Sequence, residues 1–177
     1  PLRGETFVTR KITRAVARIE KGMQNILYLG NMDAIRDWGY APDYVEAMWL
    51  MMQQATPTDL VIATGKGHTV REFAQKAFEC IGVSLVWHAT GMTECAYDGA
   101  TGQMRIAIDS RYLRPTEVPV LIGDASRART MLGWKPRKTF DELVGCMVQA
   151  DRALVASTVD NTPMYHSVVL PLLQERL

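Results

Sequence analysis

The apolar residues of this chain change repeatedly between helical spacing and short unbroken runs, and this alternation limits the possible folds more than any other feature. Residues 8–20 carry apolar side chains at offsets of 4, 7, 8 and 11 from Val8, which is the stripe of an amphipathic helix. Unbroken apolar runs at 26–29 and 60–63 are typical of buried strands. The alternation therefore predicts an α/β fold.

Two capping boxes mark helix starts in the second half of the chain. Thr69 pairs with Glu72 at one start, and Thr139 pairs with Glu142 at the other. In such a box, each side chain satisfies a backbone N–H group that the first turn leaves unpaired. The other elements predicted here are strands at 83–87 and 104–108, a loop or hairpin insertion at 89–103, a helix at 124–132 and a last helix to about 154.

The helix that begins at Pro42 and runs to about residue 54 is apolar nearly all round. Proline suits the first helical position, and the helix dipole favours the negative charge of Asp43 in the first turn. A helix that is apolar on every side is normally buried. We therefore expect this helix to lie buried against a sheet.

The stretch from Leu29 to Tyr44 holds fixed charge between two apolar runs. Arg36 is a planar donor that can bind two phosphate oxygens through parallel hydrogen bonds. An exposed ion pair between Arg36 and Asp33 is the alternative, because such pairs are common and weak. The residues alone leave both interpretations open.

A second concentration of charge lies in the stretch 110–123. Pro115 restricts the backbone beside Arg114. The carboxylate of Glu117 could form a salt bridge, orient the arginine or accept a hydrogen bond from a sugar hydroxyl. The residues alone leave these alternatives open.

Two further cations have a structural and a functional interpretation. Lys11 lies in the first turn of the helix at 8–20, where its stem can follow the apolar stripe and its ammonium can reach a cleft or solvent. Arg71 lies at the start of the helix that Thr69 opens. Its side chain could bind an anion there, or it could simply be exposed to solvent.

Composition excludes several classes of protein. Hydrophobic residues make up 47% and charged residues 22% of the 177 residues, which is ordinary for a globular domain. No basic stripe interleaved with aromatics is present, so we expect no nucleic-acid partner. No apolar stretch of about 20 residues is present, so we expect no membrane span.

Cysteine and histidine usage points to a reducing compartment without a metal centre. The three cysteines are scattered, as expected for free thiols in a cytoplasmic protein. None of the three histidines has a metal-ligand neighbour three or four residues away, so we expect no metal site. The chain begins with Pro1 instead of methionine, and we expect it to be a piece of a longer protein.

Four motifs follow one another at a characteristic spacing. They are LRGETFVTRKITRAVARI, YLGNMDAIRDWGYAPDYVEAMWLMMQQ, VIATG followed by TVREF, and RYLRPTEVPVLIGDASRARTMLGWKP. Together they resemble the C-terminal part of the GDP-mannose 4,6-dehydratase family, a branch of the extended short-chain dehydrogenase/reductase superfamily. The resemblance covers roughly residues 1–154.

The resemblance implies the C-terminal part of an NAD(P)-binding Rossmann fold together with the smaller α/β substrate-binding lobe. Family members bind NADP and convert GDP-mannose to GDP-4-dehydro-6-deoxy-mannose. They oxidise C4 of the sugar, eliminate water across C5 and C6, and return the hydride to C6. The implied parts are the terminal strands and helices of the Rossmann domain at 1–65, the GDP-sugar lobe at 66–154 and a divergent tail at 155–177.

The resemblance also assigns roles to the N-terminal cations. Arg3 matches an arginine near the nicotinamide end of NADP. Val8 and Lys11 match positions that line the GDP-sugar site. Arg36 matches the arginine on the diphosphate, in agreement with the chemistry of its side chain.

Four more positions complete the implied substrate site. Arg114 and Glu117 match positions that hold the nucleotide end. Asn31 and Arg71 are implied contacts on the sugar or ribose side. Several cations would offset the charge of a nucleotide diphosphate, which would be costly to desolvate alone.

The catalytic groups of the family have no counterpart here. The chain has no glycine-rich nucleotide loop, and none of Tyr40, Tyr44 and Tyr112 is followed by lysine four residues later. In the family, these groups and a catalytic Thr and Glu pair lie upstream. We therefore expect no catalytic residue in this chain, and no activity without an N-terminal Rossmann half.

The resemblance implies a dimer or tetramer of the assembled enzyme. The alternative function is that of a non-catalytic GDP-sugar binding remnant or an incompletely folded fragment with exposed apolar helices.

Overall fold

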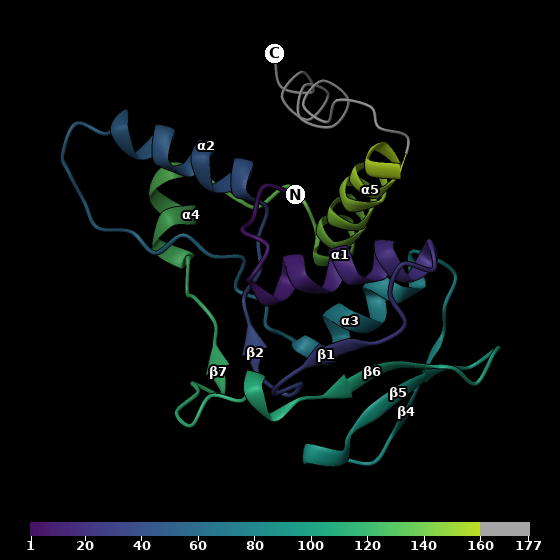
Figure 1. Cartoon of the computed structure of the whole chain (residues 1–177). Helices are drawn as coiled ribbons and strands as arrows, with labels where there is room; N and C mark the ends of the chain where they lie inside the picture. Colours follow the sequence, from purple (N-terminus) through teal and green to yellow (C-terminus); the bar gives the residue numbers. More distant parts are fainter. Residues whose placement is uncertain (160–177) are drawn as a thin grey trace.

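The computed structural model describes residues 1–159 and has an α/β fold (Figure 1). A four-stranded sheet has the order β1-β6-β5-β4, in which β1 and β6 are parallel and the other neighbours are antiparallel. Its strands are β1 (Leu27–Leu29), β4 (Leu85–His88), β5 (Cys95–Asp98) and β6 (Met104–Ile108). Helices α1 (Val8–Glu20) and α3 (Val70–Glu79) lie on one face of this sheet, and α5 (Phe140–Val159) packs against these two helices (Figure 1).

The main core lies between these helices and the sheet. The stripe of α1 buries Ile12 and Val16, and α3 buries Phe73 and Phe78, all with no exposed area. The capping box at Thr69 forms as expected and fixes the start of α3. The main core is the large cluster of buried residues that α1, α3, α5 and the four-stranded sheet contribute.

A second, smaller sheet joins the two charged stretches of the sequence. It has the order β3-β2-β7, with β2 (Ile35–Arg36) antiparallel to β3 (His68–Thr69) and parallel to β7 (Val120–Leu121). None of these two-residue strands is predicted by the apolar pattern. They bring the stretch 29–44 beside the stretch 110–123.

Helices α2 (Ala41–Met52) and α4 (Ser126–Leu132) form a unit that stands to one side of the main core (Figure 1). The α2–α4 unit has its own small cluster of buried residues. The Nε1 group of Trp134 donates a hydrogen bond of 2.8 Å to the carbonyl of Asp43. The cluster consists of Ala47, Ala63, Ala125, Ala128 and Trp134.

Two expectations about this region are wrong. The α2 helix is not buried against a sheet: only Asp43 and Ala47 are buried along it. Residues 60–63 do not form a strand, because no described strand lies beside them to complete a ladder. The insertion at 89–103 contains β5 and the short 3₁₀ helix η1 (Gly91–Thr93).

The final helix runs to Val159, past its expected end near residue 154. The capping box at Thr139 and Glu142 is present at its start. Most of the divergent tail, residues 160–177, lies outside the described residues. The division of the chain at residue 65 stays a prediction, and the main core draws residues from both sides of it.

Candidate functional site

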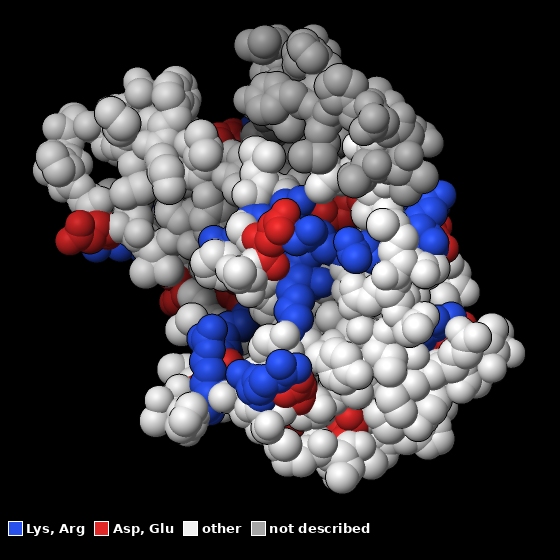
Figure 2. All heavy atoms as spheres, viewed as in Figure 1, with Lys and Arg blue, Asp and Glu red and all other residues white. Residues whose placement is uncertain are grey.

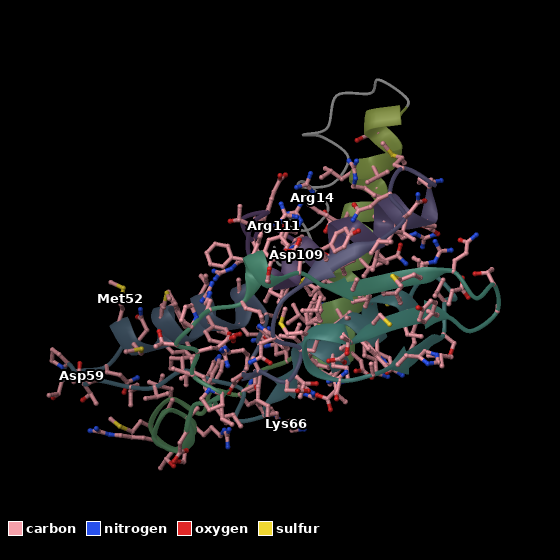
Figure 3. All side chains as sticks on the ribbon, turned by 60° about the horizontal axis from the view of Figure 1, so that its bottom comes forward. Arg14, Met52, Asp59, Lys66, Asp109 and Arg111 are labelled. Atoms are coloured by element: carbon pink, nitrogen blue, oxygen red, sulfur yellow. The ribbon has the colours of Figure 1, made fainter. Side chains whose placement is uncertain are left out.

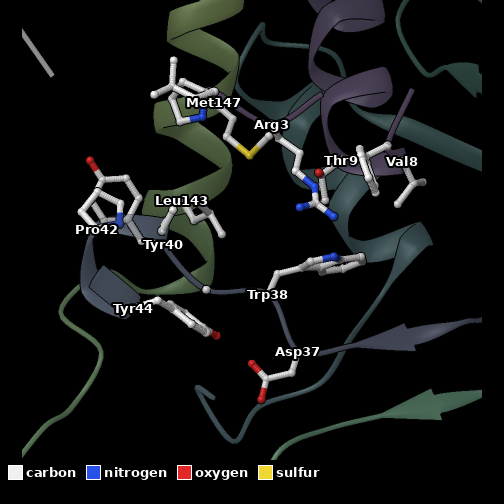
Figure 4. A pocket seen from close by; sticks show the side chains of 15 residues that line it. Arg3, Val8, Thr9, Asp37, Trp38, Tyr40, Pro42, Tyr44, Leu143 and Met147 are labelled. Atoms are coloured by element: carbon white, nitrogen blue, oxygen red, sulfur yellow. The ribbon is translucent and has the colours of Figure 1, made fainter. Parts of the chain in front are cut away.

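A cavity of about 560 Å³ opens between the N-terminal segment, the start of α2 and α5 (Figure 4). Its wall is largely apolar and aromatic, with one cation and one carboxylate, Arg3 and Asp37. Such a hollow suits a planar or apolar group with a few fixed polar contacts. The main lining side chains are those of Arg3, Phe7, Val8, Asp37, Trp38, Tyr40, Tyr44, Leu143 and Met147.

Arg3 points into this cavity from the N-terminal segment, toward the Trp38 side (Figure 4). Its guanidinium carbon lies 3.6 Å from the centroid of the Phe7 ring, within the range of a cation–π contact. Arg10 donates hydrogen bonds to the carbonyls of Pro1 and Arg3. The short N-terminal segment is therefore held in place beside the cavity by a side chain of α1.

Arg10 is itself fixed by a buried carboxylate on α5. Its Nε lies 2.8 and 3.0 Å from the two oxygens of Asp151, which has no exposed area. Thr13 donates a further hydrogen bond of 2.6 Å to Asp151. These contacts satisfy a charge that would be very costly to bury alone. The same contacts join α1, α5 and the cavity wall.

Asp37 fixes the opposite wall of the cavity by accepting hydrogen bonds from two loops. It accepts hydrogen bonds from the N–H and hydroxyl groups of Thr64 at 3.0 and 2.5 Å, and from the N–H group of Gly65 at 2.9 Å. The N–H group of Gly123 donates at 3.4 Å. Gly65 has a φ of 79°, a conformation that favours glycine. Asp37 is therefore a positioning residue for the loops that follow residues 60–63 and β7.

Arg36 is paired with Glu117 across the small sheet. The Nη2 to Oε1 distance is 3.0 Å, and both side chains are about four-fifths buried, with 22% and 21% exposed. Arg36 also donates to the carbonyl of Ile35 at 2.8 Å. The alternative partner, Asp33, instead pairs with Arg71 at 2.6 Å. The structure thus joins two of the four motifs through one ion pair.

Arg71 is surrounded by acceptors of this chain. Besides Asp33, it pairs with the buried carboxylate of Glu94, and its guanidinium lies 5.0 Å from the Trp87 ring centroid. Asn31 accepts a hydrogen bond of 2.9 Å from the N–H group of Asp33. Neither Arg71 nor Asn31 lines the cavity.

The ammonium group of Lys11 lies over the ring of Tyr112. Tyr112 belongs to the short 3₁₀ helix η2 (Ser110–Tyr112). The Nζ of Lys11 is 3.0 Å from the ring centroid. Burial lowers the pKa of Lys11 to about 8, with Asp109 opposing this effect and Arg111 adding to it. Hydrogen bonds from Arg111 in turn lower the pKa of Asp109 to about 2. Figure 3 shows Asp109 and Arg111 together, and Figure 2 shows Lys and Arg gathered on this face.

Gly30 allows η2 to approach the backbone at the end of β1 closely. A Cβ atom at position 30 would collide with the carbonyl group of Tyr112. The close approach of the two backbones therefore requires glycine here, independently of any special φ angle. It seats the loop that carries Tyr112 against the end of β1.

The predicted site residues thus fall into separate groups. Arg3 and Val8 share the cavity, Arg36 and Glu117 share an ion pair, and Lys11 lies on Tyr112. Arg114 is exposed in the loop between η2 and β7. Neither Arg36 nor Arg114 lines the cavity, so a common pocket for the two arginines stays a prediction.

Sequence reasoning did not place the aromatic rings of Trp38 and Tyr40 around a cavity. It also missed the contacts of Arg10 with Asp151. The isolated charge of Asp151 on a helix with apolar neighbours was the available signal, because such a charge is buried only with a partner. Within residues 1–159, no group of three or more His, Cys, Asp or Glu side chains could hold a metal ion.

Two solved structures that share this fold contain a bound nicotinamide nucleotide. RMD from Pseudomonas aeruginosa, solved with NADPH, matches with a TM-score of 0.70 at 20% identity, over 87% of this chain and 45% of that chain. The dTDP-glucose 4,6-dehydratase from Bacillus anthracis, solved with NAD, matches with a TM-score of 0.60 at 16% identity, over 84% and 40%. The chain therefore shares the α/β fold of part of these two enzymes.

Sequence comparison then narrows this class to one family. Residues 1–147 match the profile described as GDP-mannose 4,6 dehydratase. The chain is 54% identical to the enzyme of that name from Cricetulus griseus over 155 residues, and 51% identical to the one from Sinorhizobium fredii over 158 residues. The chain belongs to the GDP-mannose 4,6-dehydratase family. These matches include 88% and 89% of this chain but only 42% and 45% of the relatives.

No described helix combines the length and the apolar character that a membrane span requires.

Proposed function

We propose that this chain is the C-terminal, substrate-binding portion of a GDP-mannose 4,6-dehydratase. The assembled enzyme would be a lyase that converts GDP-mannose to GDP-4-dehydro-6-deoxy-mannose. It would act in the cytoplasm. The observation that carries the proposal is the largely buried ion pair of Arg36 with Glu117. It unites the RDW and RPTEV motifs, to which the family resemblance assigns the diphosphate and the nucleotide end.

The Arg36 side chain is suited to this role. It uses one Nη for Glu117 and the other for a carbonyl, while a guanidinium carries five N–H donors in all. Glu117 holds the plane of the guanidinium, so less conformational entropy is lost when a phosphate binds. Lys11 and Arg114 would supply further positive charge for the diphosphate.

The cavity that contains Arg3 fits one end of a nicotinamide cofactor and no more. Its volume and aromatic wall suit a planar ring, and Arg3 supplies the only cationic side chain among the described residues that line it. The sequence offers no glycine-rich loop for a pyrophosphate. When bound, NADP would take up and return the hydride. Arg3 and Trp38 would orient its nicotinamide end, and the remainder of the site would come from an N-terminal Rossmann half.

We infer that the isolated chain binds GDP-sugar without turning it over, and that turnover requires the joined N-terminal half in a dimer or tetramer. The test measures GDP-mannose conversion by the 177-residue chain alone and fused to the N-terminal half of the 54% identical relative. We expect conversion only by the fused chain. Conversion by the isolated chain would refute the proposed lack of catalytic groups, and failure of the fused chain would favour a non-catalytic remnant.

Calorimetry with GDP tests the binding site itself. Arg36→Ala should weaken binding by about 1.5 to 3 kcal/mol, the range for a hydrogen bond to a charged group. Arg127→Ala, which removes an exposed arginine from α4, is the matched control and should leave affinity unchanged. Equal affinity of Arg36→Ala and the parent chain would exclude Arg36 from the phosphate site.

A further inference from the structure

Aromatic rings from three parts of the chain stack on one another beside Arg36. The ring centroid of Phe140, the first residue of α5, lies 3.8 Å from that of His68 on β3, and the two planes are 7° apart. The ring of Trp38 also stacks on Phe140, at 6.1 Å and 19°. Trp38, Phe140 and His68 form the ring stack.

The main core holds the ring stack in place. Trp38 and Phe140 pack against the main core, and Phe73 within it meets both rings edge-on, at 5.1 and 5.8 Å. Aromatic pairs of this geometry contribute stability beyond the area that they bury. His68 is the member that extends toward solvent, with 27% of its side chain exposed. The stack therefore braces an imidazole at the edge of the main core.

His68 is the direct neighbour of Arg36 across the small sheet. The register pairs Arg36 with His68 on one side and with Leu121 on the other. Residues opposite each other in neighbouring strands project from the same face of a sheet, with Cβ atoms about 5 Å apart. The three side chains thus form one row with Arg36 in the middle. Leu121 is 61% exposed, so the braced imidazole is the firmer neighbour.

Arg36 needs a firm neighbour to hold one orientation. Its side chain has several rotatable bonds, and ordering such a side chain costs conformational entropy. Strand β2 consists of two residues, whose backbone pairing places the Cα atom of Arg36 without selecting a rotamer. A neighbour that is itself locked by packing restricts the available rotamers. Arg36 does hold one contact, at 3.0 Å to Glu117, and 22% of its side chain is exposed.

A second contact fixes the edge of the His68 ring. Its Nδ1 lies 3.5 Å from Oε2 of Glu72. The same oxygen accepts a hydrogen bond of 2.8 Å from the N–H group of Thr69, as part of the capping box of α3. Phe140 therefore sets the plane of the imidazole, and Glu72 lies at its edge. A ring placed from two directions is a rigid wall for the side chain beside it.

We propose that His68, braced by Phe140, is a positioning residue for Arg36. It holds the guanidinium in the orientation in which Glu117 leaves further N–H donors for a phosphate. That this phosphate belongs to GDP rests on the function proposed above. The positioning itself rests on the register, the ring distances and the ion pair. Trp38 lines the cavity (Figure 4), so the cavity wall and the phosphate-binding strand share one support.

Calorimetry with GDP on the 177-residue chain tests the positioning role. His68→Ala removes the ring and should weaken affinity about fivefold, within the range for coupled neighbours. His68→Phe keeps a ring on Phe140 and should bind GDP as tightly as the parent. His88→Ala is the matched control, because that ring meets Tyr97 in the other sheet, and it should change nothing. A loss in His68→Phe equal to that in His68→Ala would overturn the proposal.

A double-mutant cycle shows whether His68 acts through Arg36. In the Arg36→Ala background, His68→Ala should cause no further loss of GDP affinity, because no guanidinium remains to be positioned. An equal loss in both backgrounds would mean that His68 acts independently of Arg36, and the positioning role would be wrong.

Nuclear magnetic resonance of the arginine side chains tests the same role without ligand. In the parent, the Nη signals of Arg36 should be resolved, because the contact with Glu117 slows rotation of the guanidinium. His68→Ala should average these signals, and His68→Phe should restore them. Phe140→Leu removes the brace and leaves the imidazole. It should act in the same direction as His68→Ala, and it decides the matter if His68→Ala does not fold.

The two proposals fail in distinguishable ways. If the parent binds no GDP but His68→Ala averages the Arg36 signals, the substrate site is refuted and the positioning role is supported. If the parent binds GDP and His68→Ala keeps both its affinity and its Arg36 signals, the positioning role alone is overturned. Arg36 signals that are already averaged in the parent also overturn it.

Discussion

The main core and the α2–α4 unit are stabilised by different means. The main core interlocks large side chains from three helices and a sheet, among them Phe73 and Phe78 with no exposed area. The cluster of the α2–α4 unit consists of four alanines and Trp134, and polar contacts to Asp43 supplement it. The comparison teaches that large buried side chains from several elements stabilise one region, whereas the other leaves the large apolar side chains of one helix face exposed to solvent.

The largest effect should come from the centre of the main core. Phe73→Ala removes a ring that lies 5.1 Å from the Trp38 ring and 5.8 Å from the Phe140 ring. We expect the free energy of unfolding to fall by about 3 to 5 kcal/mol, the usual cost of such a truncation. Urea denaturation followed by circular dichroism measures it. A loss below about 1 kcal/mol would show that the core is loosely packed.

The contact between Arg10 and Asp151 should come next. Asp151→Asn leaves the guanidinium of Arg10 without its counter-ion, although the carbonyls of the N-terminal segment remain. We expect a loss of about 3 kcal/mol, near the lower end for breaking a buried pair. Glu20→Gln is the matched control, because its ion pair with Arg152 lies at the surface, and it should cost less than about 1 kcal/mol. Equal losses would contradict the distinction.

A smaller and local effect is expected in the α2–α4 unit. Trp134→Phe removes the hydrogen bond to the carbonyl of Asp43 while keeping an aromatic ring. The loss should be about 1.5 kcal/mol, the upper range for the net contribution of one hydrogen bond. Hydrogen exchange should accelerate in α2 and α4 but not in α5. Faster exchange in α5 as well would show that the two regions unfold together.

The smallest effect concerns ligand affinity and leaves both regions folded. The ammonium of Lys11 attracts phosphate only while it is protonated, and its pKa is lowered to about 8. If the ammonium stays charged in the complex, affinity for GDP should fall about tenfold between pH 7 and pH 9. Lys11→Arg should remove this dependence because arginine stays charged. A flat titration of the parent chain in calorimetry would exclude Lys11 from the site.

The pattern of the sequence was sufficient for the main core. Helical stripes and capping boxes depend on local spacing, so α1, α3 and α5 could be located from residues alone. The segment 60–63 and α2 were misjudged because no described strand pairs with the segment, and the described residues cover only one side of the helix. The strand tendency of Leu-Val-Ile-Ala is real only where another strand can accept its hydrogen bonds.

The site was predicted less completely than the fold. The charge and donor geometry of Arg36 marked it as important, but its true partner lies 81 residues away in sequence. Local charge offered Asp33 as the alternative partner, because the sequence shows only which residues are close along the chain. Arg71 shows the same limit: its position at a helix start indicated anion binding, and the anions it meets are carboxylates of the chain itself.

Gly30 links the backbone of one loop to the acid–base chemistry of a residue on another element. Its single hydrogen sets the spacing between the end of β1 and Tyr112, and Tyr112 covers the ammonium of Lys11. A methyl group at position 30 would lift η2, admit water to Lys11 and return its pKa toward the ordinary value for lysine. The proton affinity of this amine is therefore governed by a residue that never touches it.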